Sequence, residues 1–371
     1  MRKRSWGWRL AAIVAGLALA LGLTLGLAAC GGDDDNEAAD TSTAAAANTL
    51  NLSYVTTAQH PYGLAVEGFA KEVNADGQVT INTQASYPQA ESQLLADLQS
   101  GAVDMATISS AVWDSGGLET FEALQAPFLI TNYPLEAAVI DGDIGKSMID
   151  EVNSSQSDIV VLALHEGGLR KPFGTTPIVS LADWKGLTIR APESKVLSAG
   201  IEALGANPDP IPLPDVNQAL ANGTVDGMEA NFGLIVTQKL YEDAKEFTPN
   251  VNLWPFPTAL AVNKAKWDSL TADQQASITA AAAKIGPASI ELFSQPSTFP
   301  QDLVNCDVNF HYATPAQLGQ LVTAGQTAIP ELPASAQAYV TQIEDLKDSM
   351  PPPAKPPALP TTKTGACGST G

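Results

Sequence analysis

The chain has 371 residues, of which 45% are hydrophobic and 16% are charged. This composition is typical of a globular protein rather than a disordered or wholly membrane-embedded one. The length exceeds what one hydrophobic core usually serves, so two lobes are expected. Acidic residues outnumber basic ones by 40 to 19, which argues against nucleic acid or an anionic membrane surface as a direct partner.

The first thirty residues differ from the rest of the chain. Four basic residues lie within the first nine positions, and the stretch 10–27 is apolar apart from Thr24. A basic start followed by an apolar run is typical of a secretory signal peptide. A retained membrane anchor is the alternative, because about eighteen apolar residues can nearly span a bilayer.

The sequence L-A-A-C-G at 27–31 resembles the lipobox of bacterial lipoproteins. The resemblance implies that residues 1–29 are a lipoprotein signal peptide and that Cys30 is lipidated; the alternative is a chance cysteine after an apolar run. Each buried methylene group of an acyl chain contributes about 0.8 kcal/mol, so several chains would hold the protein to a bacterial membrane. Residues 30–48 are acidic and then rich in alanine and threonine, which predicts a flexible spacer.

Two further cysteines, Cys306 and Cys367, remain if Cys30 is lipidated. Outside the cytosol an even number of remaining cysteines favours a disulfide. Such a bond would constrain the unfolded chain by about 4 kcal/mol through lost loop entropy. The alternative is two unrelated thiols, since Cys367 lies in a tail of low complexity.

Strands alternate with short helices in two stretches of the chain, which predicts an α/β sheet in each of two lobes. The sequence L-x-x-G-x-V-D occurs at 98–104 and again at 220–226 and supports two similar lobes. In both copies a helical pattern ends at glycine and an apolar strand begins. The predicted strands are 49–57, 77–85, 103–108, 158–165, 187–190 and 210–213. The predicted helices are 60–74, 90–100, 193–204 and 214–222.

After residue 230 the pattern becomes mostly helical. The apolar spacing from Leu234 to Phe247 predicts one amphipathic helix, and the capping box T-A-D-Q at 271–274 opens an alanine-rich helix over 272–294. Pro287 is expected to break or kink that second helix, because proline lacks the backbone N–H. From Pro351 onward proline, alanine, threonine and lysine dominate, which predicts disorder.

Three segments carry a more specific pattern: L-R-K-P-F-G at 169–174, D-W-K-G-L-T-I-R-A-P at 183–192 and N-G-T-V-D-G-M-E-A-N at 222–231. They resemble the solute-binding proteins of TRAP (tripartite ATP-independent periplasmic) transporters, whose motifs are G-x-R, D-x-K-G-x-x-x-R-x-P and V-D-G-x-E. The resemblance is dense here and collinear from about residue 49 to about residue 345.

The resemblance implies a two-lobed periplasmic-binding-protein fold of the α/β class. Each lobe would hold a mixed sheet flanked by helices, with a ligand cleft between the lobes. The expected boundaries are 49–167 and 256–295 for lobe I, 168–255 and 296–345 for lobe II, and 346–371 for a proline-rich tail.

Arg190 is the main candidate for ligand binding. It ends a short strand. Pro192 holds the residue that precedes the proline, Ala191, in an extended conformation, so the side chain of Arg190 is expected at the cleft. A guanidinium matches the two oxygens of a carboxylate, and the resemblance implies that Arg190 clamps one. Arg170 stands where the family often has a second contact. The alternatives are a surface ion pair for Arg190 and, for Arg170, a hinge-stabilising ion pair with Glu166 or another acid.

Further candidates lie where predicted strands end, since polar contacts come from such loops. Asn231 is one residue later than the amide of many family members, at the position after Ala230. The others are Gln59, Ser109 and Trp113. Trp113 would form an apolar wall, with core packing as the alternative.

Enzyme functions have little support in the sequence. The three histidines are scattered, none pairs with another at metal-ligand spacing, and neither a G-x-S-x-G motif nor a phosphate-binding glycine loop occurs. We therefore expect no cofactor and no metal. The resemblance implies an extracytoplasmic protein that captures a small organic acid for a TRAP-type membrane permease. The alternatives are another uptake or sensing system, or an extracellular hydrolase or lyase on a two-lobed scaffold.

Overall fold

The structure, a computed structural model, describes residues 48–156 and 158–368. The predicted signal peptide, Cys30 and the spacer up to residue 47 lie outside this part of the chain. Within the described residues, no helix is both long and apolar enough to cross a membrane.

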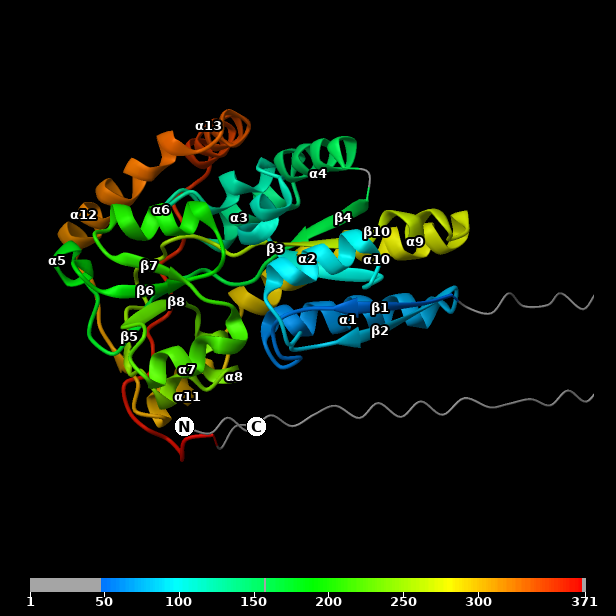
Figure 1. The fold of residues 1–371 in the computed structure, drawn as a ribbon. Coiled ribbons are helices and arrows are strands. Elements are labelled where there is room, and N and C mark those ends of the chain that lie inside the picture. Colours follow the sequence, from blue (N-terminus) through cyan, green and yellow to red (C-terminus); the bar gives the residue numbers. More distant parts are fainter. Residues whose placement is uncertain (1–47, 157, 369–371) are drawn as a thin grey trace, which may run out of the picture. The chain divides into compact units, whose positions relative to one another are not determined.

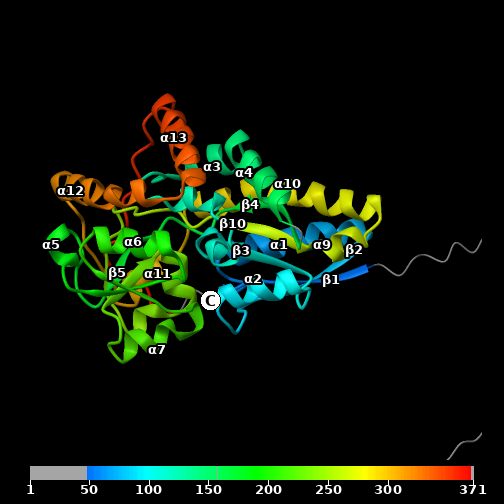
Figure 2. The ribbon, with the colours of Figure 1, turned by 45° about the horizontal axis from the view of Figure 1, so that its top comes forward.

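Two mixed β-sheets organise the described residues (Figures 1 and 2). The first sheet has the strand order β2-β1-β3-β10-β4, and β10 runs antiparallel to both of its neighbours. Its strands are β1 (Asn48–Ser53), β2 (Val79–Gln84), β3 (Met105–Ser109), β4 (Ile159–His165) and β10 (Thr258–Asn263). The fold therefore has the expected α/β class, with the late strand β10 returning to the first lobe.

The second sheet has the order β11-β9-β5-β8-β6-β7. Its strands are β5 (Lys171–Gly174), β6 (Thr188–Ala191), β7 (Asn207–Pro210), β8 (Gly227–Ala230), β9 (Glu246–Phe247) and β11 (Asn309–Phe310). β8 is parallel to β6 and antiparallel to β5, so it places its residues between those two strands. This register matters for the site, because β5, β6 and β8 each end or begin beside a functional residue.

Helices cover both sheets. On the first sheet α2 packs against β3, α4 against β4, and α1 and α10 against each other; on the second, α6 packs against β6 and β7 (Figure 1). The helices of the first half are α1 (Pro61–Asp76), α2 (Glu91–Ser100), α3 (Tyr133–Ile140), α4 (Asp143–Ser155), α5 (Leu181–Trp184), α6 (Lys195–Ala203), α7 (Val216–Ala221) and α8 (Phe232–Thr237). Those of the second half are α9 (Lys264–Asp268), α10 (Ala272–Ser294), α11 (Phe299–Asn305), α12 (Pro315–Gly325) and α13 (Ala334–Ser349).

Short 3₁₀ helices connect several of these elements. They are η1 (Ser110–Gly116), η2 (Thr120–Gln125), η3 (Leu213–Asp215), η4 (Leu240–Glu242) and η5 (Gln326–Glu331). Two chain crossings between the sheets lie side by side, because the N–H of Arg170 donates to the carbonyl of Trp254 at 2.8 Å and the N–H of Leu253 donates back to Arg170 at 2.9 Å. This pair of hydrogen bonds ties the two crossings together at the hinge.

The strand predicted at 210–213 lies three residues earlier, as β7. Alternate N–H groups face β6: that of Asn207 donates to the carbonyl of Leu187 at 2.8 Å, and that of Ile211 to the carbonyl of Ala191 at 3.1 Å. Pro208 and Pro210 fall between these positions, where no donor toward β6 is needed. Because β7 is the edge strand, their missing N–H groups cost the ladder nothing.

The single amphipathic helix predicted from Leu234 to Phe247 is wrong. The segment divides into α8, η4 and β9, and Lys239 adopts the left-handed conformation with φ 56° between the first two. Phe247 pairs with Phe173 in the second sheet instead of extending a helix. The apolar side chains of the segment still share one core cluster. The apolar spacing therefore predicted correctly which side chains are buried, but it did not predict the backbone conformation.

Of the break or kink predicted at Pro287, the break does not occur, because α10 is continuous from Ala272 to Ser294. Proline deprives the Ala283 carbonyl of its usual helical donor. Ala283 and Pro287 are both exposed, so water can solvate that carbonyl. Packing of the opposite face of α10 against α1 and β4 holds the helix together.

The C-terminal tail is not free of the fold, contrary to the predicted disorder. Residues 351–366 contain neither helix nor strand, but Cys367 forms a disulfide with Cys306 at the end of α11. The N–H of Thr364 donates to the side chain of Asn305 at 3.0 Å, and Lys363 pairs with Asp307 at 2.6 Å. The expected lobe II range 296–345 also differs from the packing, since α13 contacts η2, α3 and α4 rather than the second sheet.

Candidate ligand-binding site

A cavity of about 30 Å³ lies between residues of both lobes and both crossings. Lobe I contributes Val55, Thr56, Gln89, Glu91 and Val112. Lobe II contributes Arg190, Pro192, Glu193, Pro212, Leu213, Pro214 and Leu234. The crossings contribute Arg170 and Phe256. Both arginines singled out in the sequence therefore face one space.

Arg190 lies in β6 and is only 4% exposed. Its Nε donates to the carbonyl of Ile211 at 2.8 Å, and its Nη1 lies 3.6 Å from Oε1 of Glu229. Burial lowers the pKa of Arg190 to about 10, although the Glu229 carboxylate opposes this shift. The guanidinium is thus fixed in direction and still cationic at neutral pH.

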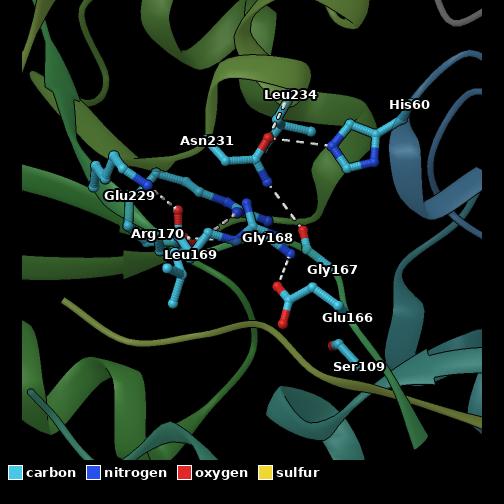
Figure 3. A network of polar contacts seen from close by, with 12 residues as sticks. His60, Ser109, Glu166, Gly167, Gly168, Leu169, Arg170, Glu229, Asn231 and Leu234 are labelled. Carbon is cyan, nitrogen blue, oxygen red and sulfur yellow. Dashed lines mark hydrogen bonds and ion pairs between the residues drawn. The ribbon is translucent and has the colours of Figure 1, made fainter. Parts of the chain in front are cut away.

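Arg170 lies at the first crossing and is 5% exposed. Its Nε lies 3.3 Å from Oε2 of Glu229 (Figure 3). Its guanidinium stacks 3.8 Å from the ring centroid of Phe256. The acid paired with Arg170 is thus Glu229 and not Glu166, the acid named from the sequence, whose carboxylate accepts a hydrogen bond from the N–H of Gly168. The Nη1 of Arg170 is buried without a hydrogen-bond partner, so it offers donors to a bound anion.

Glu229 joins the two arginines, and sequence reasoning gave it no role. It is fully buried in β8, where Arg190 of β6 pairs with Met228 and Pro172 of β5 pairs with Glu229. Burial raises the pKa of Glu229, while the two guanidinium groups act in the opposite direction. The glutamate of the V-D-G-x-E motif was the signal that could have identified it.

Glu91, the first residue of α2, is a second charged residue that sequence reasoning missed. Its carboxylate accepts from the N–H of Ser109 at 2.6 Å and from the hydroxyl of Ser109 at 2.7 Å. Burial raises the pKa of Glu91, against the effect of these hydrogen bonds and of both arginines. On the other side of the cavity, the carboxylate of Glu193 accepts from the hydroxyl of Ser92, which links lobe II to lobe I.

Trp113 does not form the cavity wall. It is fully buried, its Nε1 donates to the carbonyl of Ile108 at 3.1 Å, and its ring lies edge-on to Phe121. The neighbouring Val112 faces the cavity, because successive side chains of η1 point in different directions. The core-packing alternative describes Trp113.

Ser109 and Gln59 do not line the cavity either. Ser109 is fully buried behind Glu91 and orients its carboxylate, whereas Gln59 is exposed. A strand-end position in the sequence therefore did not distinguish a residue that faces the cavity from one that supports it.

Asn231 connects three parts of the hinge rather than facing the cavity (Figure 3). Its Oδ1 accepts from the N–H of Leu234 at 2.8 Å and caps α8, and its Nδ2 donates to the carbonyl of Gly167 at 3.0 Å. Because Nδ1 of His60 accepts from the N–H of Tyr62, the His60 proton is on Nε2, 3.2 Å from Oδ1 of Asn231. The contact joins α1 of lobe I to α8 of lobe II.

The chemistry of the cavity is that of charge-assisted hydrogen bonding. Two guanidinium groups with fixed orientation match the paired oxygens of a carboxylate, and apolar residues on both sides limit the water around them. In the described parts of the chain, no three His, Cys, Asp or Glu side chains converge as metal ligands would.

Two α/β lobes joined by adjacent crossings, with a buried charged cavity between them, define a two-lobed solute-binding protein. Residues 52–334 match the family described as bacterial extracellular solute-binding protein, family 7, and the chain belongs to this family. The resemblance to TRAP solute-binding proteins in the sequence motifs is thereby confirmed.

Several characterised proteins are similar to this chain. The C4-dicarboxylate-binding periplasmic protein of Rhodobacter capsulatus is 32% identical over 63% of this chain and 71% of that protein. The 2,3-diketo-L-gulonate-binding periplasmic protein of Escherichia coli is 25% identical over 67% of this chain and 76% of that protein. A TRAP periplasmic solute-binding protein from Ralstonia eutropha, solved with bound (S)-2-acetolactate, has a TM-score of 0.75 and 25% identity, covering 81% of this chain and 99% of that chain.

Proposed function

We propose that this protein captures a small organic acid outside the cytoplasm and delivers it to a TRAP-type membrane permease. The observation that carries the proposal is the pair of buried guanidinium groups, Arg190 and Arg170, that face one cavity between the lobes. The three similar proteins described above bind or hold acids with at least one carboxylate, which supports the same ligand class here.

Arg190 would bind the ligand carboxylate and Arg170 would assist. Glu229 pairs with Nε of Arg170 and Nη1 of Arg190, which orients both groups and leaves their other donors for the ligand. An anion buried against such preoriented donors exchanges water for matched hydrogen bonds, so binding needs no covalent chemistry. Ligand bridging the lobes would stabilise the closed state, which a permease can recognise.

Anchoring by Cys30 is part of the same proposal. Acyl chains on this cysteine would hold the protein to the outer face of a bacterial membrane, and residues 30–48 would let the two lobes reach the permease. Mass spectrometry of the membrane fraction would test this: a lipid-modified Cys30 peptide is expected, and an unmodified N-terminus at another residue would contradict it.

The ligand can be sought by thermal shift of residues 31–371, which include both lobes, against a panel of organic acids. A ligand at about 100 times its dissociation constant adds about 2.7 kcal/mol to the free energy of unfolding, which raises the melting temperature visibly. The same panel is applied to Arg190→Ala and to Lys146→Ala, which changes an exposed cation of α4 outside the cavity.

A stabilising acid whose effect is lost in Arg190→Ala and kept in Lys146→Ala is the expected result. An acid that stabilises Arg190→Ala as strongly as the unsubstituted protein would contradict the assigned site. Absence of any stabilising acid in a broad panel would contradict the ligand class.

A further inference from the structure

The charges of the cavity are unevenly divided between the lobes. The cations, Arg170 and Arg190, come from the first crossing and from lobe II, and lobe II also supplies one acid, Glu193. Of the five lobe I residues that line the cavity, none is a cation and one, Glu91, is an acid. A ligand carboxylate bound by the two arginines would therefore present the rest of the molecule to an acidic wall.

The lobe I wall offers acceptors and neutral polar groups. Ser109 donates one hydrogen bond to each oxygen of Glu91, and each carboxylate oxygen can accept a second one. Thr56 and Gln89 line the same cavity. The hydroxyl of Thr56 is buried without a hydrogen-bond partner. A buried hydroxyl without a partner is costly, so a ligand group that pairs with it would be favoured.

We infer that the cavity selects a monocarboxylate bearing at least one hydroxyl group and discriminates against dicarboxylates, with Glu91 as the residue that makes the distinction. The inference rests on the proposed function, because it takes the arginines to bind a carboxylate. The ligand hydroxyl donates to Glu91 and pairs with Thr56. A second carboxylate in its place would face the Glu91 carboxylate with no cation on that wall.

Two physical effects separate the two classes of ligand. Ser109 directs one donor to each oxygen of Glu91, which favours the ionised carboxylate over the acid form. Like charges brought together in such a site repel strongly, which disfavours the dianion. A site built to hydrogen-bond a hydroxyl also leaves Glu91 and Thr56 unpaired when that hydroxyl is missing, which disfavours the plain monoacid. The inference differs from the ligand named for the Rhodobacter capsulatus relative, a C4-dicarboxylate.

The test compares acids of equal carbon number by isothermal titration calorimetry on residues 31–371: 2-, 3- and 4-hydroxybutyrate, butyrate and succinate. We expect at least one hydroxybutyrate to bind about 100-fold more tightly than succinate and more tightly than butyrate. Succinate binding as tightly as the best hydroxybutyrate would overturn the inference but leave the proposed function standing. Failure of all five acids to bind would overturn the inference for ligands of this size, whereas only the broad thermal-shift panel can overturn the proposed function.

The role of Glu91 is tested with Glu91→Gln, which keeps the size of the side chain and an oxygen that accepts from Ser109. We expect the preference for hydroxybutyrate over succinate to fall by about ten-fold or more, because the repelling charge is removed. The control is Glu242→Gln, an exposed residue of η4 outside the cavity, which changes the net charge equally. An unchanged preference in Glu91→Gln, or an equal change in Glu242→Gln, would overturn the assignment to Glu91.

Discussion

Glu229 is the residue on which the geometry of the site depends. It is fully buried, and both arginines direct a nitrogen toward its two oxygens, at 3.3 and 3.6 Å. A buried ion pair contributes little net stability but is costly to break, because removing one member leaves the others uncompensated. The role of Glu229 is therefore to orient Arg170 and Arg190 before a ligand binds.

Arg190→Lys should lower ligand affinity by about 100-fold although the charge is retained. One ammonium group cannot reproduce both the bond from Nε to Ile211 and the approach of Nη1 to Glu229 while still presenting two donors to a carboxylate. Calorimetry with an acid identified by the thermal-shift panel measures the change. Equal affinity in this variant would show that the fork of the guanidinium is not used.

His60→Asn should reduce the loss of folding stability that occurs when the pH is lowered. Burial lowers the pKa of His60 to about 3, whereas an unfolded histidine titrates near 6.5. Between these values the unfolded state binds the extra proton, so the stability that His60 contributes is present above pH 6.5 and is lost as the pH falls. The slope is up to about 1.4 kcal/mol per pH unit for one proton.

The substitution to asparagine keeps an acceptor for the N–H of Tyr62 at the start of α1 but cannot ionise. Urea unfolding at pH 7, 6, 5 and 4 is the measurement, and His165, which is also buried, provides the same background in both proteins. Parallel pH profiles for the variant and the unsubstituted protein would contradict the expectation.

At the scale of elements, strand order brings the arginines together. β8 lies between β5 and β6, so Glu229 on the central strand reaches Arg190 on one neighbour and Arg170 just before the other. The lobe I wall is likewise set by one contact between elements, since Ser109 at the end of β3 orients the first residue of α2. Neither arrangement follows from the spacing of these residues along the chain.

Pro287→Ala should stabilise the protein by about 1–3 kcal/mol. Alanine restores a donor to the Ala283 carbonyl and removes the proline ring from the interior of a continuous helix. Chemical unfolding measures the gain, and Ala288→Gln, an exposed change at the next position, should alter stability by less than about 0.5 kcal/mol. A loss of stability in Pro287→Ala would indicate that the helix is adapted to proline here.

At the scale of the described part of the molecule, the C-terminal tail links the two lobes. α13 packs against η2, α3 and α4, and the segment after it returns to α11, where Cys367 is bonded to Cys306. Asn305 and Asp307 hold the same segment through polar contacts. The disulfide therefore restricts the conformations of the unfolded chain. In the folded protein, the disulfide and these polar contacts restrict the movement of the C-terminal segment.

Replacing both cysteines by serine should lower the free energy of unfolding by about 4 kcal/mol, because the unfolded chain regains the entropy of a closed loop of 61 positions. The melting temperature of the double variant should match that of the unsubstituted protein under reducing conditions. A melting temperature unaffected by both treatments would show that the bond adds no stability.

The sequence by itself determined the family, the two-lobed α/β class and the two arginines, because motifs and apolar periodicity are local properties. It also indicated where α1, α2 and α6 lie. It placed β7 too late and predicted one helix between Leu234 and Phe247, since apolar spacing records burial and does not distinguish a helix from short elements that share a core.

Only the tertiary structure decided which side chains meet. Glu229 pairs with both arginines, and Glu91 lines the same cavity from lobe I, because strands and helices far apart in sequence converge there. For the same reason Trp113, expected as an apolar wall, lies in the core, and Asn231, expected as a ligand contact, lies at the hinge. Which residue at the end of a strand faces the ligand depends on long-range packing. No local pattern of residue types along the chain encodes that packing.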